Sequence, residues 1–158
     1  MSRGLTFAVI AGFIFFSGCD ARRVFEENIE FKDRSWPVNE IAEFDFTINP
    51  ETINYNLYYT VRNSNDYPWS RIFITYFLID STGQELEKKL VSNFLFDQKS
   101  GKPFGSSGIG DMYDHRFIFL ENFKFPHAGK YTIRFKHYMR NEDLEGIVYV
   151  GLRVEMAQ

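Results

Sequence analysis

The chain has 158 residues and a formal net charge of −3, from 18 basic and 21 acidic side chains, and 18% of its residues are aromatic. This length suits one domain, and so much aromatic mass can fill a core and argues against disorder. The basic residues form no block, so nucleic acid is not an expected partner. A single cysteine excludes a disulfide framework and a thiolate-rich zinc site.

Residues 1–18 have the pattern of a signal peptide. Arg3 supplies one positive charge, and Leu5–Phe16 is an uncharged, mainly apolar run of twelve residues. A transmembrane helix needs about 20 apolar residues. The run is therefore too short to span a membrane stably, and it fits the apolar region of a signal sequence.

Ser17, Gly18 and Cys19 close this segment and resemble a bacterial lipobox, in which small residues precede a cysteine. The resemblance implies that the Cys19 thiol receives a diacylglyceryl group and that the amine freed by cleavage is acylated. Several acyl chains anchor a protein stably, because each buried methylene contributes about 0.8 kcal/mol. The alternative is a plain signal peptide followed by a chance cysteine. Some bacterial lipoproteins carry an acidic signal for export to the cell surface just after the cysteine. Residues 21–23 read Ala-Arg-Arg instead, which favours a periplasm-facing protein.

The rest of the chain predicts strands. Residues 19–38 are polar with isolated apolar side chains, and we interpret them as a tether that docks near Trp36-Pro37. Beyond them, apolar and polar residues alternate with the period of two that is typical of half-buried strands. Such strands are predicted at Glu43–Ile48, Asn54–Arg62, Glu85–Leu90, Tyr113–Phe119, Tyr131–Met139 and Ile147–Glu155. Ile72–Ile79 is apolar on both faces, which predicts a central strand covered on both sides.

These elements predict an all-β fold. We expect an antiparallel two-sheet β-sandwich, jelly-roll-like, with seven or eight strands over residues 39–158, after the N-terminal signal peptide. Phe73, Phe77, Phe135 or their strand neighbours are expected to fill its core. Parallel strands would need crossover helices for which the chain has no room. Asp97–Gly110 is a long connection rich in glycine and serine, so we expect it to be mobile or functional.

The sequence shows no constellation of catalytic residues. The three histidines, at positions 115, 127 and 137, stand in separate elements without metal-ligand spacing. We expect His137 to be a hydrogen-bonded core residue and His127 to be solvated. Asp111 and Asp114 could hold a cation, but a solvated loop edge is the simpler interpretation. We therefore predict no cofactor, no metal site and no enzymatic activity.

Four residues are candidates for an interaction surface: Arg62, Trp69, Arg140 and Arg153. The first three stand at strand ends beside turns, and Arg153 lies on the last strand. Arginine and tryptophan dominate the residues that carry protein–protein binding energy. The alternative is that they form salt bridges and aromatic packing at the ends of the sandwich. A second reading is a glycan-binding lipoprotein, in which Trp69, Tyr58 and Tyr138 form a stacking platform for sugars.

The C-terminal third carries a string of spaced residues that reads Pro126-x-x-Gly129-x-Tyr131, His137-x-Met139-Arg140 and Leu144-x-Gly146-Ile147-x-x-Val150-Gly151-x-Arg153-x-Glu155. This string resembles the gliding-motility lipoprotein GldH family of Bacteroidetes-type bacteria. Tyr55-Asn56-Leu57, Arg62-Asn63 and Tyr67 resemble the first half of that family. The stretch from Gln84 to Phe123 matches only in length and general character.

The resemblance implies a lipoprotein required for surface gliding and linked to the associated type IX secretion machinery. It also implies a structural or interaction role without enzymatic activity. The partners would be other envelope proteins of that machinery, with the membrane reached through the lipid anchor. The expected location is the cell envelope, as a lipid-anchored, periplasm-facing protein of the outer membrane.

Overall fold

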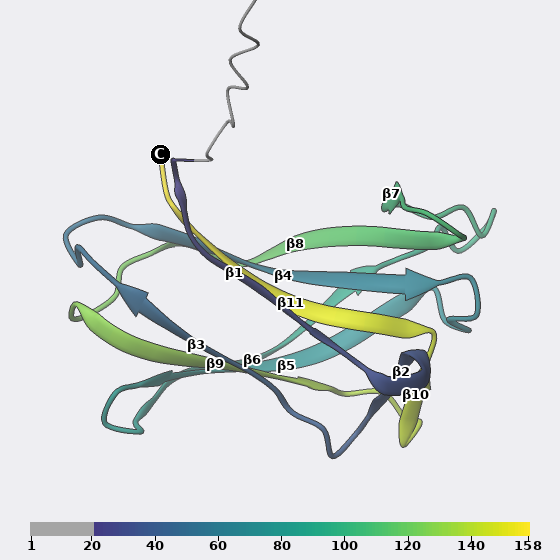
Figure 1. Ribbon diagram of the computed structural model, residues 1–158, viewed down its shortest axis with the longest axis horizontal. Coiled ribbons are helices and arrows are strands. Elements are labelled where there is room, and N and C mark those ends of the chain that lie inside the picture. The colour runs from purple at the N-terminus through teal and green to yellow at the C-terminus, as the bar shows by residue number, and fades with distance from the viewer. Residues whose placement is uncertain (1–20) are drawn as a thin grey trace, which may run out of the picture.

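The computed structural model describes residues 21–158, and these form an all-β domain of eleven strands in three antiparallel sheets. Figure 1 shows the two larger sheets as facing layers. The five-stranded sheet has the order β1 (Arg23–Glu30), β11 (Ile147–Met156), β4 (Tyr55–Ser64), β8 (Met112–Phe123) and β7 (Ser106–Ser107). The four-stranded sheet has the order β3 (Ala42–Ile48), β9 (Gly129–His137), β5 (Arg71–Asp80) and β6 (Glu85–Phe94).

The third sheet is small and joins β10 (Asp143–Glu145) to β2 (Ser35–Pro37). A short 3-10 helix, η1 (Lys32–Arg34), precedes β2. The predicted all-β, antiparallel class is confirmed, but the prediction of seven or eight strands in two sheets is wrong. Three of the four additional strands have only two or three residues, too few for a period of two to show. The fourth, β1, is an edge strand exposed over much of both faces, so it also lacks the alternation.

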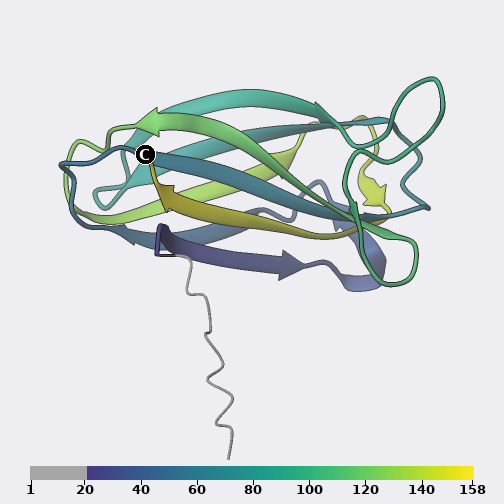
Figure 2. The same ribbon diagram turned by 90° about the horizontal axis from the view of Figure 1, so that it is seen from above.

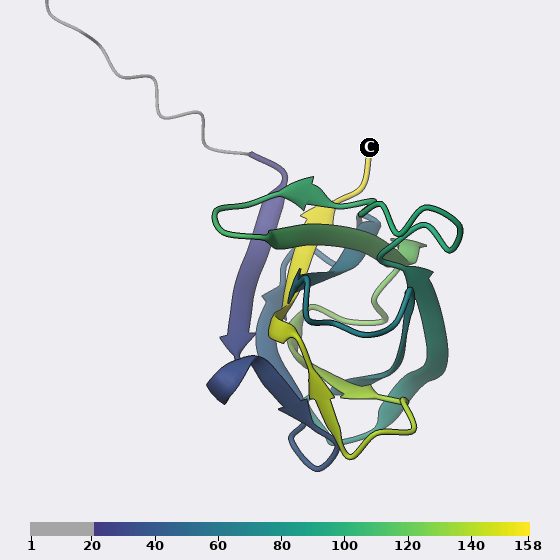
Figure 3. The ribbon, with the colours of Figure 1, turned by 90° about the vertical axis from the view of Figure 1, so that its right-hand side faces the viewer.

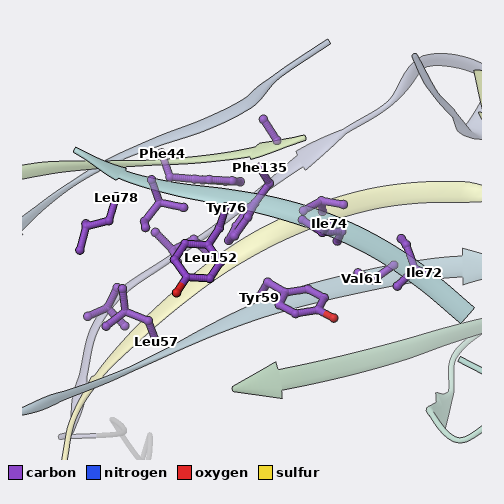
Figure 4. Packing of buried hydrophobic residues seen from close by; sticks show 14 of the residues in the cluster. Phe44, Leu57, Tyr59, Val61, Ile72, Ile74, Tyr76, Leu78, Phe135 and Leu152 are labelled. Carbon is purple, nitrogen blue, oxygen red and sulfur yellow. The ribbon is translucent and has the colours of Figure 1, made fainter. Parts of the chain in front are cut away.

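The core lies between the two large sheets, as Figure 4 shows from close by. Strand β3 alternates perfectly between buried and exposed residues, because one of its faces meets the opposite sheet. Aromatic rings bridge the layers: Phe119 on β8 lies 4.7 Å from Tyr76 on β5 and 5.4 Å from Phe135 on β9, measured between ring centroids. Phe135 is therefore a core residue, as predicted.

Strand β5 is covered on one face only. Ile72, Ile74, Tyr76 and Leu78 are fully buried or nearly so, whereas Phe73 and Phe77 lie on the opposite face and remain half-buried. The prediction that Ile72–Ile79 is covered on both sides is therefore wrong, and the strand neighbours of Phe73 and Phe77 fill the core in their place. Packing in the core therefore does not explain why the outer face of β5 carries apolar side chains.

The range interpreted as a tether contains folded structure from Arg23 onward. Strand β1 pairs with β11 from Arg23↔Glu155 to Glu30↔Tyr149. Trp36 is fully buried, stacks on Phe31 with 5.0 Å between ring centroids, and donates its indole N–H to the Glu40 carbonyl at 2.8 Å. Residues 23–37 are therefore part of the domain. The predicted signal peptide and Cys19 lie outside the described residues.

The sandwich has two distinct ends. At the near end, the described chain begins beside the C-terminus, where the Met156 N–H donates to the Arg22 carbonyl. At the far end, β4 and β9 finish, β5 begins, and the β6–β8 loop folds over, as seen in Figure 2 and end-on in Figure 3. The ten residues of β4 separate the two ends by about 30 Å. Within residues 21–158, no helix has the length and apolar character needed to cross a membrane.

Candidate interaction site

Trp69 and Arg140, predicted separately as interaction residues, line the same groove. Trp69 lies in the β4–β5 connection, and Arg140 follows β9. The groove has a volume of about 440 Å³. Its lining residues are Trp69, Phe73, Leu90, Tyr138, Met139 and Arg140. Five of the six are apolar or aromatic, and Trp69 and Tyr138 are 45% and 70% exposed. We call this the Trp69 groove.

Hydrogen bonds to the backbone carbonyls of β5 fix both walls of the Trp69 groove. The Tyr138 N–H donates to the Phe73 carbonyl at 2.8 Å, which extends the β9–β5 pairing by one step and places Tyr138 beside Phe73. On the other wall, the buried Tyr67 donates its hydroxyl to the Arg71 carbonyl at 2.9 Å. Burial raises the pKa of Tyr67, so this hydroxyl keeps its proton. The connection that carries Trp69 is therefore held at both ends.

Gly146 allows the Trp69 connection to approach the start of β11. A Cβ atom at Gly146 would lie 2.4 Å from the Tyr67 nitrogen, and its φ of +81° is one that other residues rarely adopt. The Ser64 N–H donates to the Gly146 carbonyl at 2.8 Å. The glycine predicted as part of the family string thus has a packing role beneath the groove.

The long loop predicted to be mobile or functional lies beside Trp69. A second groove, of about 300 Å³, is shared between the Trp69 connection and residues Phe96, Asp97, Gln98 and Gly101. The Asp97 carboxylate accepts hydrogen bonds from the Ser100 hydroxyl and N–H at 2.7 and 2.8 Å, and these bonds lower the pKa of Asp97. The first residues of the loop therefore form a hydrogen-bonded turn beside the connection that carries Trp69.

Exposed apolar side chains gather toward this end of the molecule. Among the described residues, seven large hydrophobic side chains are exposed, and all except Ile118 lie in the far-end loops or line the Trp69 groove. The six are Ile41, Trp69, Leu90, Phe104, Ile109 and Tyr138. Clustered exposed apolar side chains commonly mark interaction sites, whereas scattered ones need no explanation.

Arg62 lies away from the Trp69 groove, on the outer face of the five-stranded sheet. Its guanidinium donates two hydrogen bonds to the Asp114 carboxylate, both of 2.7 Å, and lies 5.0 Å from the centroid of the Tyr149 ring. The Tyr149 hydroxyl donates to the same carboxylate at 2.8 Å. Hydrogen bonding from Arg62 lowers the pKa of Asp114, so the charged form of this carboxylate is stabilised by a partner within the chain.

Arg153 lies on the same outer face and is almost completely buried by its partners. It donates to Glu26 at 2.8 Å and to Glu155, and is only 6% exposed. The structure therefore does not bring Arg62 and Arg153 together with Trp69 and Arg140. It places them in ion pairs, as the structural alternative anticipated. A role in binding stays a prediction for both.

The proposed sugar platform of three aromatic residues does not form. Tyr58 pairs with Arg153 and Ile118 in the five-stranded sheet, whereas Trp69 and Tyr138 lie over the other sheet. Only the last two share a surface. A polar groove of about 520 Å³ does lie on the outer face of the five-stranded sheet, where it is lined by Glu26, Asn28, Thr60, Ser106, Asp114, His115, Arg116 and Tyr149.

His137 lies in the core and His127 is exposed, as predicted for each. His137 is 1% exposed, packs against Trp36, and accepts a long hydrogen bond of 3.4 Å from the Met139 N–H. His127 is exposed in the β8–β9 turn. His115 is buried, and burial lowers its pKa to about 4. No group of three metal-ligating side chains occurs within residues 21–158.

Phe73, Leu90 and Met139 line the groove but were missed as site residues. The sequence contained one signal: Leu90 and Phe73 are apolar residues on strand faces that the structure places outside the core. An apolar side chain in the outward register of a strand is such a signal. It became readable only when the structure showed which face is outward.

The predicted lipobox and the all-β domain that follows it are the features expected of a lipid-anchored protein of the cell envelope. The chain belongs to the GldH lipoprotein family, since the model of that family matches residues 23–154. The resemblance seen in the sequence is thereby confirmed, and gliding motility is the process with which the family is associated.

Two relatives match nearly end to end. The chain is 30% identical over 156 residues to a gliding motility lipoprotein GldH homolog of Christiangramia forsetii, covering 94% of this chain and 93% of that one. It is 29% identical over 154 residues to the gliding motility lipoprotein GldH of Flavobacterium johnsoniae, covering 93% and 92%.

Solved structures give only distant similarity. The structure of infectious bursal disease virus, Gx strain, matches with a TM-score of 0.35 and 9% identity over 84% of this chain and 29% of the viral chain. The VP2 subviral particle of the same virus matches with a TM-score of 0.33 and 10% identity, over 82% of this chain and 29% of that chain.

Proposed function

We propose that this protein is a structural component of the gliding-motility and associated type IX secretion machinery, and that it holds an envelope protein partner through the Trp69 groove. The observation that carries the proposal is the meeting of Trp69 and Arg140 in one open, mainly apolar groove. Tryptophan and arginine commonly provide the centre of a protein interface. The names of the relatives support the link to gliding. In this proposal the domain acts by binding, without catalysing a reaction.

The start of the fold supports an arrangement of the domain on the membrane. Strand β1 begins at Arg23, and four residues of extended chain from Cys19 to Arg23 reach at most about 14 Å. If Cys19 carries the lipid, the near end of the sandwich lies against the membrane. The Trp69 groove at the far end then faces away from it, at a height where a periplasmic partner of an outer-membrane lipoprotein can reach it.

The test is truncation of the two predicted residues. Trp69→Ala and Arg140→Ala, each introduced into the full chain in a strain that lacks its own copy, should abolish gliding and the recovery of the partner after crosslinking in membranes. Loss of a central interface side chain typically costs about 2 kcal/mol or more of binding free energy. Ile118→Ala is the matched control, because Ile118 is 41% exposed but lies on the other sheet.

The variants must remain lipidated, abundant and folded for the result to count. If Trp69→Ala and Arg140→Ala lower the melting temperature by several degrees while partner recovery persists, both residues are structural. The interface would then be sought first on the Asp97–Gly110 loop, where Ile109 is 96% exposed.

Glycan binding is the second candidate, supported by the pairing of Trp69 with Tyr138 in one groove. The protein offers a clean optical test, because Trp36 is fully buried and Trp69 is 45% exposed. A shift in tryptophan fluorescence on titration with envelope polysaccharides, absent in Trp69→Phe, would favour this candidate. An unchanged spectrum at saturating polysaccharide would exclude stacking on Trp69.

A further inference from the structure

The outer face of β5 and β6 carries apolar side chains, and within residues 21–158 no third layer covers it. Phe73 and Phe77 on β5 and Leu90 on β6 lie on this face. In Figure 1 the four-stranded sheet forms the lower layer of the sandwich, with the opposite sheet only on its inner side. Phe73 and Leu90 also line the Trp69 groove, so the groove continues onto the sheet.

Where β9, β5 and β6 pair along this face, basic side chains outnumber acidic ones, and Glu43 and Asp45 lie on the neighbouring edge strand β3. The pairing of β9, β5 and β6 places Arg134, Phe77 and Lys88 in one row, and Lys136, Thr75 and Leu90 in the next. Arg71 pairs with Phe94 at the end of β5 nearest the groove. Glu43, on the neighbouring edge strand, forms an ion pair with Arg134. This concentration of positive charge occurs on a chain whose formal net charge is −3.

Three of these cations have no carboxylate partner within the described chain: Arg71, Lys88 and Lys136 form no salt bridge among residues 21–158. Arg71 and Lys88 instead lie over aromatic rings. The Arg71 guanidinium is 3.9 Å from the Phe94 centroid, and the Lys88 ammonium is 5.0 Å from the Phe77 centroid. Such contacts hold the cations against the sheet and leave them able to accept an anionic partner.

Arg71 shows an unmet hydrogen-bonding requirement. Its Nε atom is buried and has no acceptor within the described chain. Buried donors are nearly always satisfied, so this one is an unusual feature of the surface. A carboxylate is the acceptor that suits a guanidinium best, because the two groups match in both charge and geometry.

We propose that this surface, formed by Arg71, Phe73, Phe77, Lys88, Leu90 and Lys136 and continuous with the Trp69 groove, docks an acidic protein segment that also carries apolar side chains. The inference rests on the proposed function and names the chemistry of its partner. Carboxylates of the segment meet Arg71, Lys88 and Lys136, while its apolar side chains cover Phe73 and Leu90 and enter the groove. A protein segment is favoured over a lipid surface because the residues that line the groove lie at the end of the domain opposite Arg22, where the described chain begins.

The test uses the purified mature, lipidated protein in neutral detergent and two fluorescein-labelled peptides of equal length. One peptide repeats Asp-Phe-Gly and the other repeats Lys-Phe-Gly, so they share apolar content and differ only in charge. Fluorescence anisotropy should show binding of the acidic peptide and not of the basic one. The affinity should fall as sodium chloride is raised, because exposed charge pairs are screened.

Charge reversal then locates the site. Lys88→Glu combined with Lys136→Glu should weaken binding of the acidic peptide by about tenfold or more, since each reversal replaces an attraction by a repulsion. Lys88→Gln with Lys136→Gln should give an intermediate loss, and it serves if the reversal variant fails to fold. The matched control is Lys32→Glu with Lys124→Glu, an equal change of charge at exposed positions outside the four-stranded sheet.

Several results would overturn the inference. These are equal binding of both peptides, no binding of the acidic peptide, or the same loss in the control variant. Binding to phosphatidylglycerol vesicles that is lost on reversal of Lys88 and Lys136, without peptide binding, would assign the face to a membrane surface instead. If Trp69→Ala abolishes partner recovery in cells and charge reversal does not, the proposed function stands and the acidic chemistry of the partner is wrong.

Discussion

At the scale of single residues, buried histidines are the groups most sensitive to pH. His115 stacks against Phe117 with 5.7 Å between ring centroids, is 5% exposed, and has no hydrogen-bond partner for its Nε2 atom among the described residues. Burial lowers its pKa to about 4, although the neighbouring Asp114 acts in the opposite direction. The folded protein therefore holds His115 neutral at a pH where the unfolded chain already binds a proton.

The stability of the domain should consequently fall as the pH drops below about 6.5. The unfolded histidine binds its proton near that value, and the folded one binds it only near 4, so the stabilisation is complete above 6.5 and is lost across this window. For one histidine, the free energy of unfolding should fall by at most about 1.4 kcal/mol per pH unit.

Urea denaturation at pH 7 and pH 5.5 measures this loss. His115→Leu, which replaces the ring by an apolar side chain, should reduce the difference between the two pH values. Some difference should remain, because burial also lowers the pKa of His137. An identical loss in wild type and His115→Leu would show that His115 does not carry the effect.

At the scale of elements, the segment before the sandwich is the main departure from the sequence prediction. Residues 19–38 have no strand periodicity, yet they contain β1, η1 and β2. An edge strand needs to bury few side chains, so its sequence is not forced to alternate. The strands that do face the core, such as β3, β4 and β9, alternate clearly and were predicted close to their observed bounds.

Trp36→Ala tests whether this segment is part of the cooperative fold. Trp36 is fully buried between Phe31 and His137, so its truncation should lower the free energy of unfolding by about 3–5 kcal/mol. Lys32→Ala, at an exposed position in the same segment, should change it by less than about 0.5 kcal/mol. Denaturation followed by circular dichroism gives both values, and an unchanged midpoint for Trp36→Ala would restore the interpretation as a tether.

At the scale of the whole molecule, the two ends have different roles in our proposal. The chain enters at one end, close to the C-terminus, and most exposed hydrophobic side chains lie toward the other. A domain fixed to a membrane by its first residues and binding through its far end would show this polarity.

The lipid anchor itself remains a prediction, and Cys19→Ser tests it. Without the thiol, the diacylglyceryl group cannot be attached, so the precursor should keep its Leu5–Phe16 segment, or a soluble product should appear if cleavage occurs elsewhere. Mass spectrometry of the wild-type mature protein should find Cys19 at its N-terminus carrying acyl chains. An unmodified Cys19 in that protein would contradict the prediction.

The sequence alone determined the all-β class, the positions of the seven long strands that face the core, the lipobox and the family. These depend on local alternation or on short motifs, both of which are complete within a few neighbouring residues. Only the tertiary structure decided which face of β5 is inward, because a strand apolar on both faces carries no sign of its own orientation. It also decided that Trp69, Leu90 and Tyr138 share a groove, since residues so far apart in the chain meet only through strand pairing and the packing of two sheets.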